Sequence, residues 1–214
     1  VAVVAGDGMR QVFTSLGASR IVAGGQSMNP SVQQLAEAAA TIPGDTVVLL
    51  PNNPNVLLVC QHLHEVVTKR VLVVPSHTMP QGIAALLAVD LNDSVDDQAA
   101  AMQAAVTAVV SIEVTTATRS VTLDGMDIWD GQTIGLVDRK LVAAGADPLD
   151  VLGQVLDRLA APAGSLLTLY YGAGVTEADA EATAAALRAR PHAPEVDVVW
   201  GGQPHYAYLA SLEV

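Results

Sequence analysis

The first 90 residues alternate short apolar runs with segments of helical periodicity. The apolar runs, each four or five residues long and rich in Val, are Val1–Ala5, Arg20–Ala23, Thr46–Leu50 and Arg70–Val74. Short runs of this kind are typical of strands buried on both faces. Between them, apolar residues recur at i, i+3, i+4 and i+7 over residues 32–39 and 56–63. The alternation predicts a parallel sheet with right-handed helical crossovers.

A different pattern begins near residue 94. Residues 94–110 are Ala-rich and predict one helix, with Ser94 as its N-cap. From 111 onward the apolar positions alternate with polar ones, and the Asp-Gly pairs at 124–125 and 130–131 are typical of hairpin turns. Residues 111–142 are therefore expected to form an antiparallel β region.

The remaining residues return to alternating strands and helices. Helices are predicted near 147–160 and 176–190, and strands at Leu166–Tyr171, Val196–Trp200 and Tyr206–Leu212. The whole chain is predicted to be α/β with two subdomains. Residues 1–93 form a parallel sheet with flanking helices, and residues 94–214 form an α+β subdomain with the antiparallel hairpin region.

Composition narrows the classes of partner. The 22 acidic and 10 basic residues give a net charge of −12, which repels phosphate backbones and anionic membranes, so no nucleic acid is expected as a partner. No run approaches the roughly 18 apolar residues of a membrane span, so no membrane insertion is expected. The single cysteine, Cys60, suits a reducing compartment, and a cytoplasmic location is expected. Because the chain opens at Val1 inside an apolar run, we expect it to be part of a longer protein.

Polar loops follow the predicted parallel strands, where ligands bind in open sheets of this kind. Two of the loops end in Asn-Pro, at 29–30 and 53–54, and each pair is predicted to start a helix. Free amide groups at helix starts attract anions such as carboxylates. Together with a late Gly-Gln pair, the expected binding or docking residues are Gly24, Gly25, Gln26, Ser27, Asn29, Asn52, Asn53, Ser76, His77, Thr78, Gln81, Gly202 and Gln203.

Catalytic and metal sites are not expected. The chain has no phosphate-binding G-x-x-x-x-G-K motif and no G-x-S-x-G motif around a nucleophile. Cys60 and His64 could share one face of a predicted helix, but two ligands make a weak zinc site, and Cys60 fits a core position better. Asp7 is a candidate general base that is more typical of a helix cap. His77 is a candidate acid, base or anion donor that is more typical of a structural histidine.

Four separated motifs resemble those of a known family. GGQSMNPS (24–31), LLPNNPN (49–55), VPSHTMPQGIAALLA (74–88) and WGGQPHY (200–206) occur in the order found in the C-terminal domain of the fatty acid kinase A subunit. This family is also described as dihydroxyacetone-kinase-related or DAK2-domain proteins. The first subdomain is similar to the DegV-type fold of the acyl-binding subunits, in which two loops hold a fatty acid carboxylate. Asn52 and Asn53 stand where those proteins have a Ser-rich loop.

The resemblance implies a division of labour within a longer protein. An N-terminal domain would bind ATP and magnesium, and the complex would phosphorylate a fatty acid carboxylate. This C-terminal domain would carry no cofactor and no catalysis of its own. It would dock the DegV-like acyl-binding subunit or support a homodimer. Two alternatives stay open, a domain that binds a fatty acid or another small carboxylate and a phosphatase-like domain.

Overall fold

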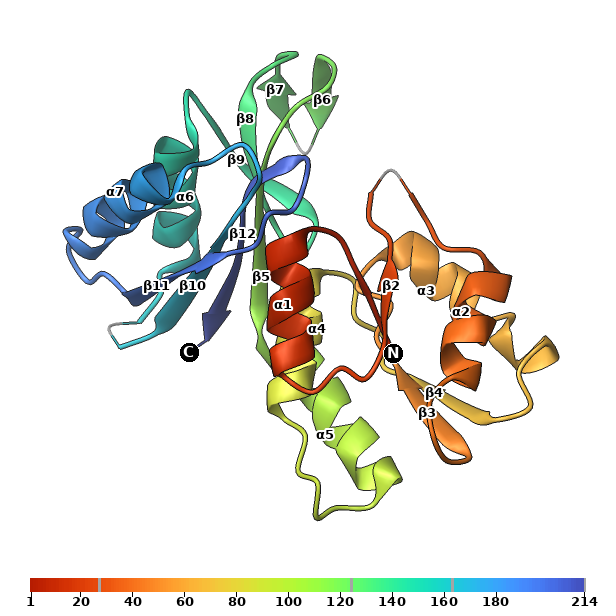
Figure 1. Cartoon of the computed structure of the whole chain (residues 1–214). Coiled ribbons are helices and arrows are strands. Elements are labelled where there is room, and N and C mark those ends of the chain that lie inside the picture. Colours follow the sequence, from red (N-terminus) through yellow and green to blue (C-terminus); the bar gives the residue numbers. More distant parts are fainter. Residues whose placement is uncertain (27, 124, 163, 214) are drawn as a thin grey trace. The chain divides into compact units, whose positions relative to one another are not determined.

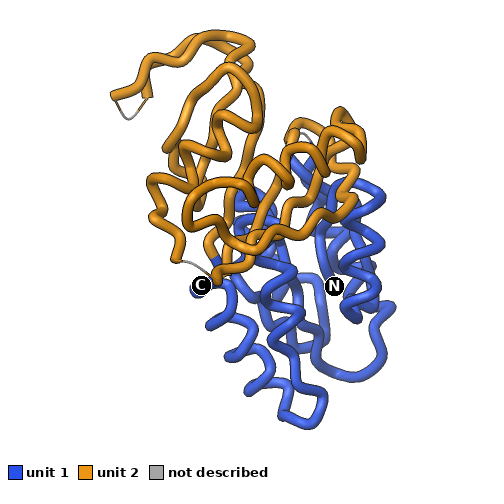
Figure 2. Tube along the Cα trace, turned by 90° about the vertical axis from the view of Figure 1, so that its left-hand side faces the viewer, with its two compact units in different colours: residues 1–109 blue, residues 110–214 orange. Residues whose placement is uncertain are grey.

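The computed structural model describes residues 1–26, 28–123, 125–162 and 164–213. The chain divides into two compact units, residues 1–109 and 110–214, coloured separately in Figure 2. The sequence predicts the boundary between residues 93 and 94, whereas the two units meet between residues 109 and 110. Helix α5 (Val95–Ala108) belongs to the first unit because it packs against helix α4 (Met79–Leu87).

The first unit alternates strands and helices along the chain (Figure 1). Its elements before α4 and α5 are β1 (Ala2–Val4), α1 (Asp7–Ser15), β2 (Ile21–Ala23), α2 (Val32–Ala40), β3 (Thr46–Leu49), α3 (Pro54–Cys60), the 3₁₀ helix η1 (Leu63–Glu65) and β4 (Arg70–Val73).

The strands of the first unit form two parallel pairs, β1 with β2 and β3 with β4. A parallel bridge between Ala2 and Leu50 joins the two pairs, so the strands run in the order β2-β1-β3-β4. Helices α2 and α3 lie on one side of these strands and α1 and α4 on the other (Figure 1). The predicted parallel sheet with flanking helices is confirmed.

The second unit is built on a six-stranded sheet, in the order β11-β10-β12-β5-β8-β9. Only β10 and β11 are parallel, and the other neighbours are antiparallel. The elements are β5 (Val110–Thr116), β6 (Val121–Leu123), β7 (Met126–Ile128), β8 (Thr133–Val137), β9 (Lys140–Gly145), α6 (Pro148–Leu159), β10 (Leu166–Tyr171), α7 (Glu177–Arg188), β11 (Glu195–Trp200) and β12 (Tyr206–Glu213).

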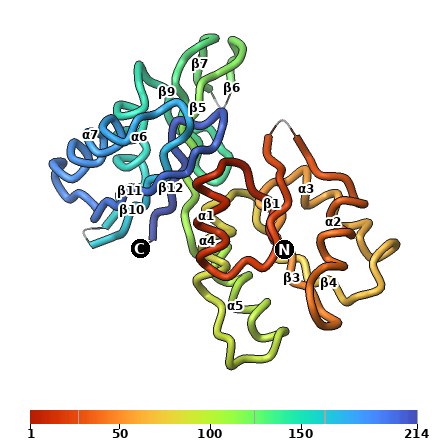
Figure 3. Tube along the Cα trace, viewed as in Figure 1, coloured from red at the N-terminus to blue at the C-terminus, as the bar shows by residue number. Residues whose placement is uncertain are grey.

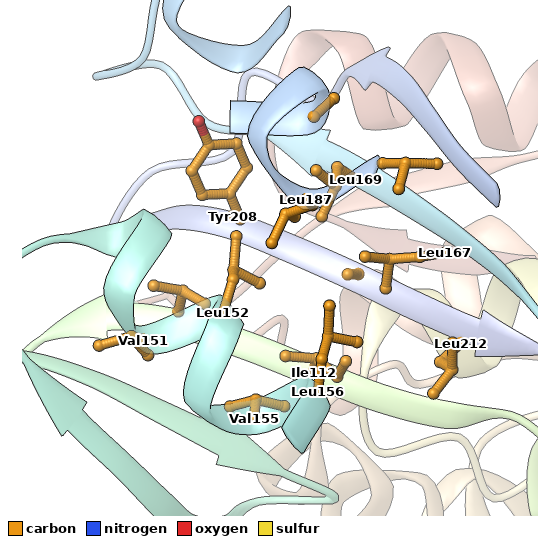
Figure 4. Packing of buried hydrophobic residues seen from close by; sticks show 14 of the residues in the cluster. Ile112, Val151, Leu152, Val155, Leu156, Leu167, Leu169, Leu187, Tyr208 and Leu212 are labelled. Atoms are coloured by element: carbon orange, nitrogen blue, oxygen red, sulfur yellow. The ribbon is translucent and has the colours of Figure 1, made fainter. Parts of the chain in front are cut away.

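The core of the second unit lies between this sheet and helices α6 and α7. In α6, Val151, Leu152, Val155 and Leu156 fall on one face and are buried. Figure 4 shows them packed against strand residues that include Ile112. Fully burying a side chain of this size contributes about 1.5–3 kcal/mol. The amphipathic pattern of α6 therefore fixes which face of the sheet the helix covers.

The antiparallel region of the second unit differs from its prediction in one turn. Strands β6 and β7 pair with each other and lie beyond the end of the main sheet (Figure 3). Gly131, with a φ of 82°, links β7 to β8, but β8 pairs with β5 and β9. The pair 130–131 therefore joins two sheets and does not close a hairpin. Asp124, predicted in the other turn, lies outside the described residues.

Two further observations bear on sequence-based expectations. The helix predicted to contain Cys60 and His64 ends at Cys60, and His64 lies in η1. The two side chains are therefore not one turn apart on a single α-helix. Within the described ranges, no helix is both long enough and apolar enough to cross a membrane.

Candidate functional site

The candidate site of the first unit is the carboxyl edge of its strands. We use this name for the three segments 24–31, 50–55 and 74–82, which follow β2, β3 and β4; the first leads into α2, and the other two include the first residues of α3 and α4. Parallel strands place these loops at the same edge of the sheet. All of the predicted site residues except Gly202 and Gln203 belong to these loops.

A buried hydrogen-bonded pair, Asn52 and Ser76, holds two of the loops together. The backbone N–H of Asn52 donates to Ser76 Oγ at 3.0 Å, and that hydroxyl donates to Asn52 Oδ1 at 2.7 Å. Asn52 Nδ2 donates to the carbonyl of Val3 in β1 at 3.0 Å. Asn52 and Ser76 are 7% and 0% exposed. These polar atoms therefore bond to one another and to the strands, and the three strand ends are tied together.

Asn52 also has an unusual backbone. Its φ of 54° lies in the left-handed region, which Asn tolerates better than most residues. The Asn52 side chain lies so close to Gly82 of α4 that a Cβ there would approach Asn52 Oδ1 to 2.1 Å. Only glycine fits at position 82. The geometry of the pair therefore depends on a third residue from a separate helix.

Two more of the predicted residues, Asn53 and Thr78, are helix N-caps. Asn53 is the N-cap of α3, with Oδ1 accepting from Asn55 N–H at 2.8 Å, and Pro54 takes the first helical position. Thr78 is the N-cap of α4. The Gln81 side chain accepts from His77 N–H at 2.8 Å. Asn53 and Thr78 are 4% and 3% exposed, so neither lies on an open surface.

The loop after β2 differs from its prediction. Asn29 and Pro30 do not start α2, because the N-cap is Ser31. Ser31 Oγ accepts from Gln34 N–H at 3.2 Å, and the Gln34 side chain accepts from Ser31 N–H at 2.9 Å. This reciprocal capping box satisfies two donors, whereas Asn29 two residues earlier would satisfy fewer. Asn29 is exposed, and Ser27 lies outside the described residues.

Gly24 and Gly25 allow that loop to pack closely against β1 and the residue that follows it. A Cβ at Gly24 would lie 2.6 Å from Val3 Cγ1, and one at Gly25 would lie 2.9 Å from the Ala5 Cβ. Any larger residue would push the loop away from β1. The exposed Gln26 and Asn29 are thereby held on a loop that lies directly against the sheet.

Gly202 and Gln203 belong to the second unit. The Gln203 side chain is fully buried, and its Nε2 donates to the carbonyl of Tyr170 at 2.8 Å. Ala173 N–H donates to the Gln203 carbonyl at 3.1 Å, so the glutamine links the loops that follow β10 and β11. Gly202 has a φ of 60°, and a Cβ there would meet the ring of Trp200 at 3.1 Å.

The candidate base Asp7 and the thiol of Cys60 lie in different environments. Asp7 opens α1, and its carboxylate lies 3.9 Å from Arg10 in an exposed ion pair. Burial raises the pKa of the Cys60 thiol to about 12, so it stays protonated at neutral pH. No group of three or more His, Cys, Asp or Glu residues is arranged to hold a metal ion among the residues described.

Two features of the site were not predicted, although the sequence contains a signal for each of them. Ser31 and Gln34 match the S-x-x-Q spacing of a capping box. Gly82 lies inside a helix, where glycine costs about 0.5–1 kcal/mol relative to alanine, and such a glycine often marks close packing. The partner that requires this glycine, Asn52, lies 30 positions earlier, and no local pattern connects the two.

Residues 1–213 match the FakA-like C-terminal family, whose members are like the C-terminal part of the fatty acid kinase A subunit. The chain belongs to this family. It is 33% identical over 213 residues to Protein YloV of Bacillus subtilis and 31% identical over 208 residues to a protein of Staphylococcus aureus strain USA300. These matches cover 100% and 97% of this chain, but only 38% of each relative.

Solved structures share the fold at low identity. The DegV family protein Cg2579 of Corynebacterium glutamicum has a TM-score of 0.68 at 12% identity, covering 100% of this chain and 97% of that one. The DegV lipid binding protein TM1468 of Thermotoga maritima has a TM-score of 0.63 at 12% identity, with coverages of 87% and 76%. The Streptococcus pneumoniae fatty acid kinase B3 protein loaded with linoleic acid has 0.57 at 11%, with coverages of 86% and 76%. The predicted DegV-like α/β fold is confirmed, and the DAK2 assignment stays a prediction.

Proposed function

We propose that this domain is a docking module for an acyl-binding subunit of the DegV-like class, acting in fatty acid phosphorylation without catalysis of its own. Family membership across residues 1–213 supports a role related to fatty acid kinase. In a longer protein of this family, ATP and magnesium would bind outside these 214 residues. Docking at the carboxyl edge is the specific part of the proposal.

The proposal rests on one observation: the buried polar groups at the carboxyl edge form their hydrogen bonds within the domain. Asn52 and Ser76 bond to each other, and Asn53 and Thr78 cap helices. A pocket for a small carboxylate needs donors that point outward, whereas these side chains are buried. Their arrangement favours a pre-organised surface, in which fixed loops present exposed groups such as Gln26 and Asn29.

Calorimetry tests this proposal directly. The 214-residue chain is titrated with an acyl-binding subunit from the same genome, with and without fatty acid. The double variant Gln26→Ala/Asn29→Ala is expected to weaken binding by about tenfold, as for contacts near the centre of an interface. Gln103→Ala, an exposed change on α5, is the matched control and should bind like the unchanged chain. Equal affinity of the double variant and the control would contradict docking at this edge.

A second candidate function is binding of a fatty acid by the domain itself. It is favoured by DegV-fold neighbours such as the Thermus thermophilus protein described by its fatty acid binding, which has a TM-score of 0.58. Native mass spectrometry of the domain after mild purification decides this point. A retained mass that matches a fatty acid would support the second candidate, and an unliganded mass after incubation with oleate would contradict it.

A further inference from the structure

We propose that the segment preceding Val1 in a longer protein of this family extends strand β1 and fills an apolar cavity in the first unit. We call it the amino-edge cavity, because it lies at the amino ends of β1 and β3, away from the carboxyl edge. Its volume is about 370 Å³. The chain covers only 38% of each of the two relatives named above, so most of each relative lies outside the matched part. The proposal is independent of docking at the carboxyl edge.

The amino-edge cavity is apolar and reaches the surface. Its walls include residues of β1, β3, α4, α5 and the loop between α1 and β2. Met102 of α5 is buried in the wall, whereas Leu91, which follows α4 and also lines the cavity, is 88% exposed. None of the described lining residues has a charged side chain. Because covering apolar surface is favourable, the cavity suits an apolar side chain better than a charged group.

Strand β3 has open hydrogen-bonding positions beside the cavity. The carbonyls of Asp45 and Leu49 accept from backbone N–H groups on the β4 side. The Val48 carbonyl lies on the other side and accepts from the Val1 amine at 2.8 Å. The Val48 N–H and the Thr46 carbonyl therefore face the line along which β1 would continue before Val1. Open positions of this kind are a template for a further strand segment.

The two-residue period of a strand decides which added side chain meets the cavity. Val1 and Val3 pack in the cluster that includes side chains of α2 and α3. Ala2, between them, lines the cavity on the other face, as does Val48. Successive side chains of a strand alternate between faces, so the residue immediately before Val1 would point into the cavity. We therefore expect that residue to be apolar, and the residue before it to pair with β3.

The surroundings of the Val1 amine also suit a peptide bond. Burial lowers the pKa of this amine from 8.0 to about 6, because the charged form loses its solvation. The folded state therefore loses stability as the pH falls from 8 toward 6. A peptide N–H would donate the same hydrogen bond to the Val48 carbonyl without a charge.

The test adds three residues to the 214-residue chain and follows its thermal unfolding. One version carries Gly-Ala-Leu before Val1, and the matched control carries Gly-Ala-Asp. The Leu version should unfold about 4 °C above the Asp version, because only leucine fills the cavity favourably. Hydrogen exchange of the Val48 N–H, followed by NMR, should be about tenfold slower in the Leu version than in the unextended chain.

Two exposed leucines show whether the gain arises in the cavity. Leu91→Ser changes the lining and should remove about half of the gain, because part of the apolar contact is lost. Leu87→Ser changes a 60% exposed residue of α4 outside the described lining and should leave the gain unchanged.

Three results would overturn the proposal. Equal stability of the Leu and Asp versions would show that the added side chain does not enter the cavity. Unchanged exchange at Val48 would show that β1 is not extended along β3. Equal effects of the two serine variants would place the added residues elsewhere on the surface.

Discussion

The carboxyl edge of the first unit and the start of helix α6 in the second unit use the same local chemistry with opposite results. Both contain polar side chains that cap helices. At the carboxyl edge, Asn53 and Thr78 are buried, and the neighbouring Asn52 and Ser76 bond to each other. At the start of α6, Asp147 caps the helix while remaining exposed. Burial therefore decides whether a capping residue is enclosed by its own fold or stays in contact with water.

This difference has an energetic consequence. A buried polar atom that loses its partner costs about 1–3 kcal/mol, whereas an exposed one regains water. Substitution of a buried polar residue at the carboxyl edge should therefore cost more stability than substitution of an exposed helix cap such as Asp147, for which about 1 kcal/mol is typical.

The largest effect is expected for Ser76→Ala. This change leaves the N–H and Oδ1 of Asn52 without their shared partner in a buried site. The free energy of unfolding should fall by about 3 kcal/mol, measured by urea denaturation. Ser19→Ala, an exposed serine in the same unit, is the control and should stay within about 0.5 kcal/mol. A loss at Ser76 no larger than at Ser19 would contradict the structural role of the pair.

A somewhat smaller loss is expected for Gly82→Ala. The new methyl group would overlap Asn52 Oδ1, and overpacking of this kind costs about 2 kcal/mol. The comparison is Gly153→Ala in α6, where the nearest atom is Nη1 of Arg190 at 2.7 Å, at the end of a long side chain that also bonds to the Gly153 carbonyl and to Asp157. Because a long side chain can move away more easily than the buried Asn52, Gly153→Ala should cost less stability than Gly82→Ala. Thermal unfolding of both variants gives the comparison, and equal behaviour of the two would refute the close approach at position 82.

The start of α2 provides a third comparison. Ser31→Ala removes the hydroxyl of the capping box and should cost about 1 kcal/mol. Asn29→Ala should leave stability nearly unchanged, because Asn29 caps no helix. Urea denaturation of the two variants distinguishes these positions. A greater loss at position 29 would restore Asn29 as the helix start.

Titration of Cys60 is expected to change stability only in alkaline solution, with no effect at neutral pH. Its pKa is raised from 9.0 to about 12 by burial, so the folded state disfavours the thiolate. The contribution to stability is complete below pH 9 and is lost as the pH rises from 9 toward 12. A thiol-reactive disulfide reagent at pH 8 should modify Cys60 only after denaturation. Rapid modification of the folded chain would place the thiol at the surface.

The fold could largely be predicted from the sequence because its signals are local. The period-two pattern after 111 marks β5, and Asn53-Pro54 starts α3 as predicted. The candidate site was harder to predict, because part of it depends on contacts between distant residues. Asn29-Pro30 has the same local pattern, but the capping box of Ser31 satisfies more donors. The bonds of Asn52 to Ser76 and Val3 span 24 and 49 residues, and no local propensity encodes contacts of that range.

One further turn illustrates the same limit. Asp138 and Arg139, between β8 and β9, have φ values of 45° and 69°, although turns of this kind usually contain glycine. The strands on either side pair and hold the turn in place. Strand pairing here overrides the local preference, which is why the sequence did not indicate the turn.

Hydrogen exchange tests the central claim most directly. The exchange of the 214-residue chain is measured alone and with an excess of the acyl-binding subunit. Docking at the carboxyl edge predicts slower exchange in peptides that cover 24–31 and 75–82, with unchanged exchange at the hairpin of β6 and β7. Protection confined to that hairpin, or no protection at the carboxyl edge in a complex that demonstrably forms, would contradict the account.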